Sequence, residues 1–174
     1  KKVVKYHHTK GGGVRGCLID ASKAFDRVKL MILFNILLKR GLPYGVTRLL
    51  IDSYVRQKVR TIWGGHTSDT FFTTNGVRHG GVLYPILFAV YIDCLLDKLE
   101  ASGYGCKVGC EYFGALGSAD DLTLLAPTVY ALQQMLYICE SFGIEYDVLW
   151  NPSKSICIDF PGTTTYKGDP PTVT

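Results

Sequence analysis

Val14–Asp20 reads VRGCLID, a short and mostly apolar run that ends in a carboxylate and follows three consecutive glycines at 11–13. A run of this length and composition, entered from a flexible turn, is typical of a β-strand. An acid at the end of an apolar strand faces a cleft more often than a core, because burying an unpaired charge is costly. The stretch therefore predicts a strand that presents Asp20 to a site.

A second acidic position lies about a hundred residues further along the chain. Two apolar runs, 112–116 and 122–126, flank the segment Gly117-Ser118-Ala119-Asp120-Asp121, which predicts a hairpin with two acids at its tip. Antiparallel pairing with the first strand would bring Asp20, Asp120 and Asp121 together. Taken singly, the two acids could also be ordinary turn residues, and Asp20 a helix cap.

A cluster of three carboxylates requires a cation, because the charges otherwise repel one another. Hard oxygen ligands suit Mg²⁺. Two such ions about 3.5 to 4 Å apart can hold the attacking and leaving oxygens of a phosphoryl transfer. The three acids therefore predict a metal-dependent site for phosphate chemistry.

The remaining elements follow from hydrophobic periodicity and from glycine and proline positions. We expect helices over 30–39, 46–57, 85–101 and 129–142, and further strands over 58–62, 70–74 and 155–160. Gly41 and Gly143 mark the ends of two of these helices. The order of strand, helices, hairpin, helix and strand predicts an α+β fold, an antiparallel sheet with helices packed on one face.

Charge is distributed unevenly along the 174 residues, whose net charge is +4. Residues 1–60 contain fourteen Lys or Arg and three acids, so residues 61–174 are left with five basic and twelve acidic side chains. A basic first third suits a polyanionic partner, since phosphate contacts supply affinity that is independent of sequence. This division is typical of a nucleic-acid enzyme that needs metal ions.

Three basic residues alternate along the strand expected near residue 58: Arg56, Lys58 and Arg60. They would share one face and could bind a nucleic-acid backbone, although a solvated edge strand has the same pattern. Aromatic residues nearby could stack on bases, but we expect core packing instead for all of them: Tyr54, Trp63, Phe71 and Phe72.

Several classes of protein are excluded by composition. The apolar stretch 79–92 has fourteen uncharged residues, whereas a membrane-spanning helix needs about 20. Residues 1–10 are basic and polar and lack the apolar region of a secretory signal. The six cysteines are scattered, with Cys106 and Cys110 the closest in sequence, so we expect reduced intracellular thiols rather than a zinc site.

Four motifs occur in a fixed order along the chain. They are 20–26 (DASKAFD), 76–88 (GVRHGGVLYPILF), 118–121 (SADD) and 151–155 (NPSKS). Together they strongly resemble the reverse transcriptase domain of non-LTR (LINE-type) retrotransposons, over about residues 14–160. The resemblance implies a polymerase palm with partial fingers and no thumb over 1–160. Residues 161–174 would be a loop or the start of a truncated downstream segment.

The resemblance also assigns the metal and proton chemistry. Asp20 and Asp120 would each bind both Mg²⁺ ions, for which Mn²⁺ could substitute, and Asp121 would be a supporting acid of the same site. Lys154 would donate a proton to the departing pyrophosphate, whereas a lysine considered alone would be a solvated surface residue.

Nucleotide binding is assigned by the same resemblance. The backbone at Ala21 would face the triphosphate of the incoming nucleotide. Phe25 would be a steric gate against a ribose 2′-OH, with a core aromatic as the alternative. His79 would lie near the incoming base, and Gly80 and Gly81 would let the backbone approach nucleotide and template, where a Cβ would intrude.

Three positions depart from the family pattern. Ser118 replaces an aromatic residue, His79 a glutamine and Tyr84 a serine. We expect the change at 118 to remove a packing wall under the hairpin tip and the change at 79 to alter a contact near the incoming base.

Two functions from different classes follow. The first is an RNA-directed DNA polymerase that binds an RNA template, a DNA primer and deoxynucleoside triphosphates; it would be nuclear, with cytoplasmic ribonucleoprotein assembly. The second is a catalytically silent polymerase-like module that binds only RNA or protein. A two-metal nuclease or phosphatase would share the acids but would not explain Phe25 or the pair Gly80 and Gly81. The oligomeric state does not follow from the sequence.

Overall fold

The structure is a computed structural model that describes residues 1–55, 58–72, 76–77, 82–118 and 121–162. The chain divides into two compact units, one formed by Lys1–Ala24 with Ile92–Thr174 and the other by Phe25–Tyr91. Five predicted site residues lie outside the described residues, so their predictions stay untested: Arg56, His79, Gly80, Gly81 and Asp120.

The first unit is built on an antiparallel sheet with β1 (Val14–Ser22) at its centre. The strand order is β10-β1-β9-β8, and β11 also pairs with β1. The partners of β1 are β9 (Asp121–Ala126), β10 (Leu149–Trp150) and β11 (Ile156–Phe160), while β8 (Ala115–Ser118) pairs with β9. The predicted hairpin and its pairing with the first strand are therefore confirmed, although its first strand is 115–118 and not 112–116.

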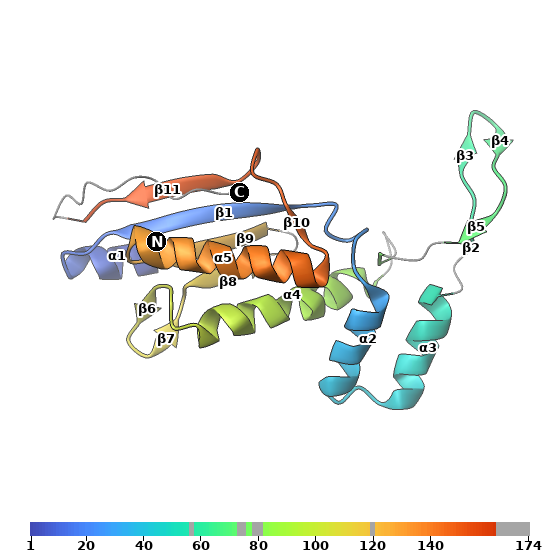
Figure 1. Ribbon diagram of the computed structural model, residues 1–174, viewed down its shortest axis with the longest axis horizontal. Coiled ribbons are helices and arrows are strands. Elements are labelled where there is room, and N and C mark those ends of the chain that lie inside the picture. Colours follow the sequence, from blue (N-terminus) through green and yellow to red (C-terminus); the bar gives the residue numbers. More distant parts are fainter. Residues whose placement is uncertain (56–57, 73–75, 78–81, 119–120, 163–174) are drawn as a thin grey trace. The chain divides into compact units, whose positions relative to one another are not determined.

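The two faces of this sheet differ because side chains alternate along each strand. Cys17 and Ile19 of β1 and Leu122 and Leu124 of β9 are buried on one face. Two helices of eighteen residues each, α4 (Tyr84–Ala101) and α5 (Val129–Tyr146), contribute buried side chains to this unit, such as Leu95 and Met135. Figure 1 shows α5 along β1 and β9, with which it is in contact.

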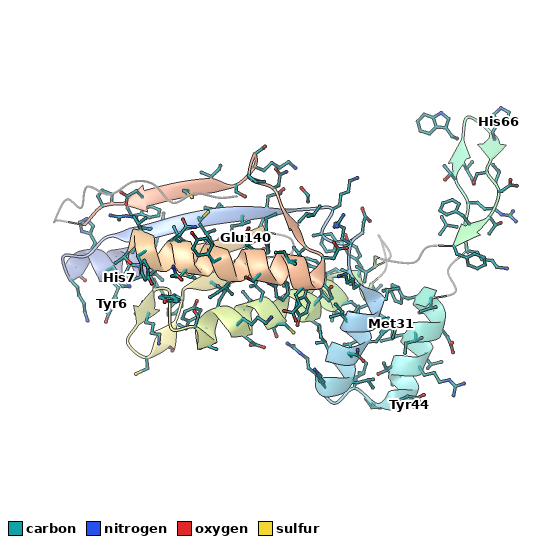
Figure 2. The ribbon with its side chains drawn as sticks, in the orientation of Figure 1. Tyr6, His7, Met31, Tyr44, His66 and Glu140 are labelled. Carbon is teal, nitrogen blue, oxygen red and sulfur yellow. The ribbon has the colours of Figure 1, made fainter. Side chains whose placement is uncertain are left out.

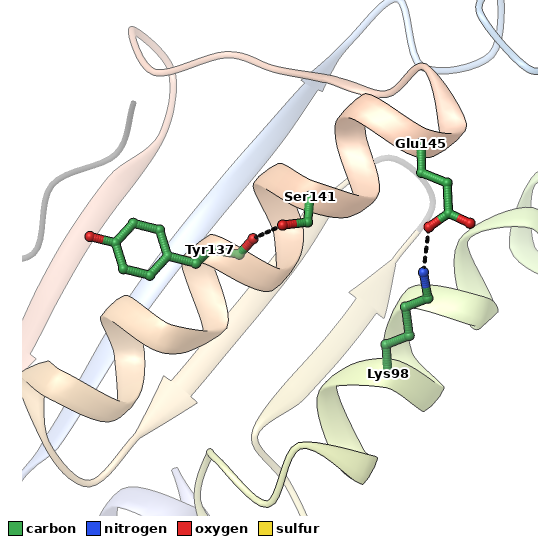
Figure 3. A network of polar contacts seen from close by, with 4 residues as sticks. All are labelled: Lys98, Tyr137, Ser141 and Glu145. Carbon is green, nitrogen blue, oxygen red and sulfur yellow. Dashed lines mark hydrogen bonds and ion pairs between the residues drawn. The ribbon is translucent and has the colours of Figure 1, made fainter.

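Polar contacts link the two helices to each other and brace α5 internally (Figure 3). Lys98 of α4 forms an ion pair with Glu145 of α5, with 2.7 Å between Nζ and Oε2. The Nζ atom of Lys98 also lies 5.6 Å from the ring centroid of Phe142. Within α5, the hydroxyl of Ser141 donates to the carbonyl of Tyr137. Because the ion pair is half-exposed, it contributes little stability, about 1 kcal/mol at most.

Within the first unit, the opposite face of the sheet is covered at its far end by described residues. There α1 (Lys2–Thr9) places Val3 against Val14 and Cys106 in a small apolar cluster. A short hairpin, β6 (Lys107–Val108) with β7 (Glu111–Tyr112), follows Cys106. Towards Asp20 the same face is open, and Leu18 is 43% exposed. This part of the sheet carries Asp20 and Asp121.

The C-terminal end of helix α5 differs from the expected one. We expected it to end at Gly143, but it runs on to Tyr146, and Asp147 forms the left-handed cap at φ 58°. Gly143 is buried inside the helix, where an added Cβ would lie 2.6 Å from the carbonyl oxygen of Val148. The glycine therefore permits close packing rather than termination.

The second unit contains a helical pair. Helix α2 (Leu30–Lys39) has the predicted bounds and lies beside α3 (Tyr44–Val55) (Figure 1). Gly41 adopts φ +84° after α2, and the amide of Leu42 donates to the carbonyl of Leu37, which is the expected glycine termination. Among the described helices, none has the combination of length and apolarity needed to cross a membrane.

The rest of this unit includes a narrow hairpin. Its strands are β2 (Lys58–Val59), β3 (Ile62–Trp63), β4 (His66–Thr67) and β5 (Phe71–Phe72). Figure 2 shows His66 at its outer turn. Tyr54, in α3, is buried as expected, but core packing is wrong for Trp63, Phe71 and Phe72, which are 85%, 46% and 60% exposed. A two-stranded ribbon has two open faces, so its aromatic side chains stay in solvent.

Candidate active site

Three polar residues form a row across the open face of the sheet. In the strand register, Asp20 of β1 lies opposite Asp121 of β9, and Asp121 lies opposite Ser118 of β8. Directly opposite residues of an antiparallel pair point to the same face, with Cβ atoms about 4.5 to 5.5 Å apart. The fold therefore brings together two carboxylates that are a hundred residues apart in sequence.

A turn after β10 holds the backbone of Asp20 on both sides. The amide of Asn151 donates to the carbonyl of Asp20 at 2.8 Å, and the amide of Asp20 donates to Oγ of Ser155 at 3.4 Å. The Ser155 hydroxyl itself donates to the carbonyl of Asn151 at 2.8 Å. Asn151 and Ser155 are functional positions that the motif alone does not reveal, although asparagine, proline and serine in one short segment signal a structured turn.

The same turn brings Lys154 to the acids. Its Nζ lies 3.8 Å from Oδ2 of Asp20, and the two side chains are 69% and 25% exposed. An exposed ammonium at this distance neutralises part of the carboxylate charge. Lys154 therefore lies beside Asp20, and its predicted role as proton donor stays a prediction.

The side chains at this site are of the type that binds a divalent cation. Asp20 and Asp121 offer carboxylate oxygens from one face of the sheet, and hard oxygen donors are the ligands of Mg²⁺ and Mn²⁺. Among the described residues there is no group of three potential metal ligands. The third predicted ligand, Asp120, lies outside the described residues. The described part thus supplies two of the three predicted donors.

The second unit places an aromatic cluster around Phe25. The rings of Phe25 and Tyr84 stack with centroids 4.2 Å apart, and Phe88 lies 4.4 Å from Phe25 at a tilt. The carbonyl of Phe25 accepts from the amide of Val77 at 3.0 Å. Because the Phe25 ring is only half-buried, both predicted roles, gate and core aromatic, stay open. One of the three departures, Tyr84, is the residue that stacks on Phe25.

The other predicted residues lie as follows. Ala21 is buried and pairs with Trp150 of β10, while its neighbour Asp20 points to the open face. Lys58 and Arg60 are both exposed: Nζ of Lys58 lies 5.8 Å from the centroid of Phe72, and Nε of Arg60 donates to Thr70 at 2.7 Å. Both side chains are accessible to a phosphate backbone.

Ser118 requires a correction. We expected its small side chain to leave a packing hole beside the hairpin tip, but Ser118 is exposed at the end of β8. It lies on the open face, opposite Asp121. An aromatic residue at 118 would therefore border the carboxylates instead of filling the core.

Comparison with known proteins places this arrangement in a family. The family described as "Reverse transcriptase (RNA-dependent DNA polymerase)" matches residues 3–164. That range contains all four motifs and the whole described sheet. Enzymes of this family generally use divalent metal ions.

Relatives among curated proteins narrow the assignment. The chain is 36% identical over 125 residues to the Pol polyprotein of the type-2 retrotransposable element R2DM of Drosophila melanogaster, covering 70% of this chain and 12% of that protein. It is 32% identical over 134 residues to the Pol polyprotein of an R2 element of Nasonia vitripennis, and this match covers 77% of this chain and 13% of that protein. The chain thus spans only about an eighth of the length of these two relatives.

Solved structures share the fold. Apo telomerase from Candida tropicalis superposes with a TM-score of 0.67 at 15% identity, covering 91% of this chain and 33% of that one. A telomerase from the same organism in complex with a telomeric RNA fragment superposes with a TM-score of 0.66 at 13% identity. This match covers 85% of this chain and 26% of that one. Identity this low establishes the palm-type fold alone. Taken with the family match over residues 3–164, these findings show that the chain belongs to the reverse transcriptase family, as the reverse transcriptase domain of a non-LTR retrotransposable element.

Proposed function

We propose that this domain is the catalytic core of an RNA-directed DNA polymerase, which adds deoxynucleotides to a DNA primer on an RNA template by two-metal phosphoryl transfer. One observation carries the proposal: Asp20 and Asp121 lie opposite each other on the open face of the sheet, with the Lys154 ammonium 3.8 Å from Asp20. Family membership and the relatives named above support the same reaction.

The acids would hold a pair of Mg²⁺ ions, with Mn²⁺ able to substitute. We propose that Asp20 and Asp120 bind both ions and that Asp121 supports them. When bound, such ions stabilise charge on the attacking and leaving oxygens. The hydrogen bonds from Asn151 and to Ser155 fix the backbone of Asp20, and this keeps its carboxylate in position on the open face.

Lys154 would supply the proton that leaves with pyrophosphate. Its Nζ is exposed and lies beside Asp20, so it can reach solvent and the site without rearrangement of the sheet. A positioned general acid typically contributes a factor of about 10² to 10⁴ in rate. The contact with Asp20 keeps the ammonium beside this acid.

Nucleotide selection would depend on Phe25, with Ala21, His79, Gly80 and Gly81 along the path of the incoming nucleotide. The stack of Tyr84 on Phe25, at 4.2 Å, supports this role because it restricts the ring to one orientation. A ring held in place excludes a 2′-OH by collision, which is the most direct way to create a difference between two affinities.

The exposed hairpin would contact the template-primer. Lys58 lies in β2 and Arg60 directly follows that strand, and both side chains are exposed. Arg56 would extend this basic row. The exposed indole of Trp63 offers a surface on which bases can stack. Charge and aromatic exposure on one narrow hairpin support nucleic acid as the partner. The complex of a telomerase with telomeric RNA is a precedent in a protein of the same fold.

Primer extension on an RNA template tests the proposal. We expect Asp20→Asn to abolish incorporation of labelled deoxynucleotides by a full-length element protein that carries these residues. Asp52→Asn is the matched control, because Asp52 is an exposed acid on α3, and it should leave the rate unchanged. Retained incorporation in Asp20→Asn would refute the assignment. No incorporation by the unchanged protein, with RNA binding intact, would favour the silent module instead.

A further inference from the structure

Two cysteines face each other across neighbouring strands of the central sheet. Cys17 of β1 and Cys157 of β11 are direct partners in the antiparallel register. The thiol of Cys157 donates to Sγ of Cys17 at a sulfur–sulfur distance of 3.3 Å, although 140 residues separate them in sequence. Partners of this kind have Cα atoms about 4.5 or 5.5 Å apart, and both values lie within the range of a disulfide, about 4.4 to 6.8 Å.

Access to the two sulfurs differs. Cys157 lies on β11, whose side chains are mostly exposed, whereas Cys17 of β1 is fully buried. Burial raises the pKa of Cys17, and the neighbouring sulfurs of Cys157 and Cys139 raise it further. An oxidant therefore meets Cys157 first, and Cys17 is within reach to react second.

We propose that Cys157 is a site of thiol–disulfide exchange and that Cys17 resolves it, giving a reversible disulfide between β1 and β11. The oxidant is a low-molecular-weight disulfide of the glutathione class. The sulfurs need to approach from 3.3 Å to about 2.05 Å, a movement that rotation of the two side chains can provide without a shift of the sheet.

The exchange proceeds in two steps that balance. The Cys157 thiolate attacks one sulfur of the oxidised glutathione, forms a mixed disulfide and releases one glutathione thiolate, which takes up a proton. The Cys17 thiolate then attacks Sγ of Cys157, and the second glutathione leaves in the same way. Two protein thiols are oxidised and one small disulfide is reduced to two thiols. The raised pKa of Cys17 makes the second step slower at neutral pH than at alkaline pH.

The disulfide would act on the strand that carries the site. Cys17 is three residues before Asp20, and Cys157 is three residues after Lys154. Beyond Phe160 no further strand pairs with β11 among the described residues, so only β1 retains it in the sheet. A covalent bond at the pair 17 and 157 would prevent β11 from separating and would hold the Lys154 turn against β1.

To test this proposal, the full 174-residue chain is treated with oxidised glutathione and the remaining free thiols are blocked. Peptide mapping by mass spectrometry then identifies which cysteines are linked. We expect a linked peptide pair containing Cys17 and Cys157, with a Tm about 10 °C higher, because the bond closes a long loop. Cys157→Ser should abolish both the link and the Tm rise. Cys110→Ser is the matched control, since Cys110 is also exposed, and it should retain both.

Three results would overturn the proposal. One is a stable glutathione adduct on Cys157 with Cys17 still reduced, even at alkaline pH. Another is a disulfide of Cys17 with Cys139 instead of Cys157. The third is an identical Tm rise in Cys157→Ser, which would show that oxidation acts elsewhere. Because the test measures disulfide formation and Tm and not polymerase activity, these outcomes are independent of the proposed reaction.

Discussion

Replacing Lys154 by methionine separates the catalytic role of its ammonium from its contribution to stability. The ion pair with Asp20 spans 3.8 Å, and the side chains are 69% and 25% exposed. Exposed pairs of this kind contribute about 0 to 1 kcal/mol. The unfolding free energy of Lys154→Met should therefore fall by less than about 1 kcal/mol, because methionine retains the length of the aliphatic chain and removes only the charge.

The effect on rate should be much larger. Loss of a general acid lowers kcat by a factor of about 10² to 10⁴, equivalent to about 3 to 5 kcal/mol of transition-state stabilisation. Single-nucleotide incorporation on a primed RNA template measures kcat and KM, and denaturant unfolding measures stability. Lys107→Met is the control, because Lys107 is exposed on β6, and its kcat should be unchanged. A kcat within about threefold of the parent value would refute the proton-donor role.

Three further predictions concern packing, selectivity and pH. Gly143→Ala should lower the unfolding free energy by about 1 to 3 kcal/mol in a urea titration, because its Cβ would meet the Val148 carbonyl at 2.6 Å; a gain in stability would contradict this packing. Tyr84→Ser should reduce discrimination against ribonucleotides about 2- to 12-fold, the equivalent of one lost aromatic contact, and unchanged discrimination would mean that the 4.2 Å stack on Phe25 has no part in selection. Burial raises the pKa of Cys106 from 9.0 to about 11, so above pH 9 the unfolded chain releases this proton while the folded chain keeps it. The unfolding free energy should then fall by up to about 3 kcal/mol between pH 9 and 11, and an equal decline in Cys106→Ala would assign the loss to other groups.

The sequence predicted the acids well because their signal is local. A carboxylate at the end of an apolar run identified Asp20 in β1, and two acids between two apolar runs identified Asp121 at the start of β9. Antiparallel pairing then brings strand ends together whatever the length of chain between them. The antiparallel sheet with packed helices followed from hydrophobic periodicity and element order, and its palm type followed from the family resemblance.

The errors arose where tertiary context decides. Gly143 has the sequence signature of a helix end, but its use is close contact with Val148, which no local pattern reveals. Trp63 has a large apolar side chain of the kind that usually packs in a core. It is exposed because a ribbon of two strands has no core in which to bury it. Ser118 was assigned to a packed wall, although its register opposite Asp121 places it on the open face. The contact of Cys17 with Cys157 depends on a register that spans the whole chain.

Direct measurement of divalent metal binding tests the central proposal, that Asp20 binds the catalytic ions together with Asp120 and that Asp121 supports them. Electron paramagnetic resonance reports free Mn²⁺ during titration of the protein with bound primer-template and a deoxynucleoside triphosphate. We expect Asp20→Asn and Asp121→Asn to weaken Mn²⁺ binding, with at least a tenfold loss (about 1.4 kcal/mol) for Asp20→Asn, while Asp52→Asn binds as the unchanged protein does. Excess Mg²⁺ should displace the bound Mn²⁺. Equal Mn²⁺ affinity in Asp20→Asn and the unchanged protein would contradict the account, because the row of acids on the open face would then have no part in holding the metal.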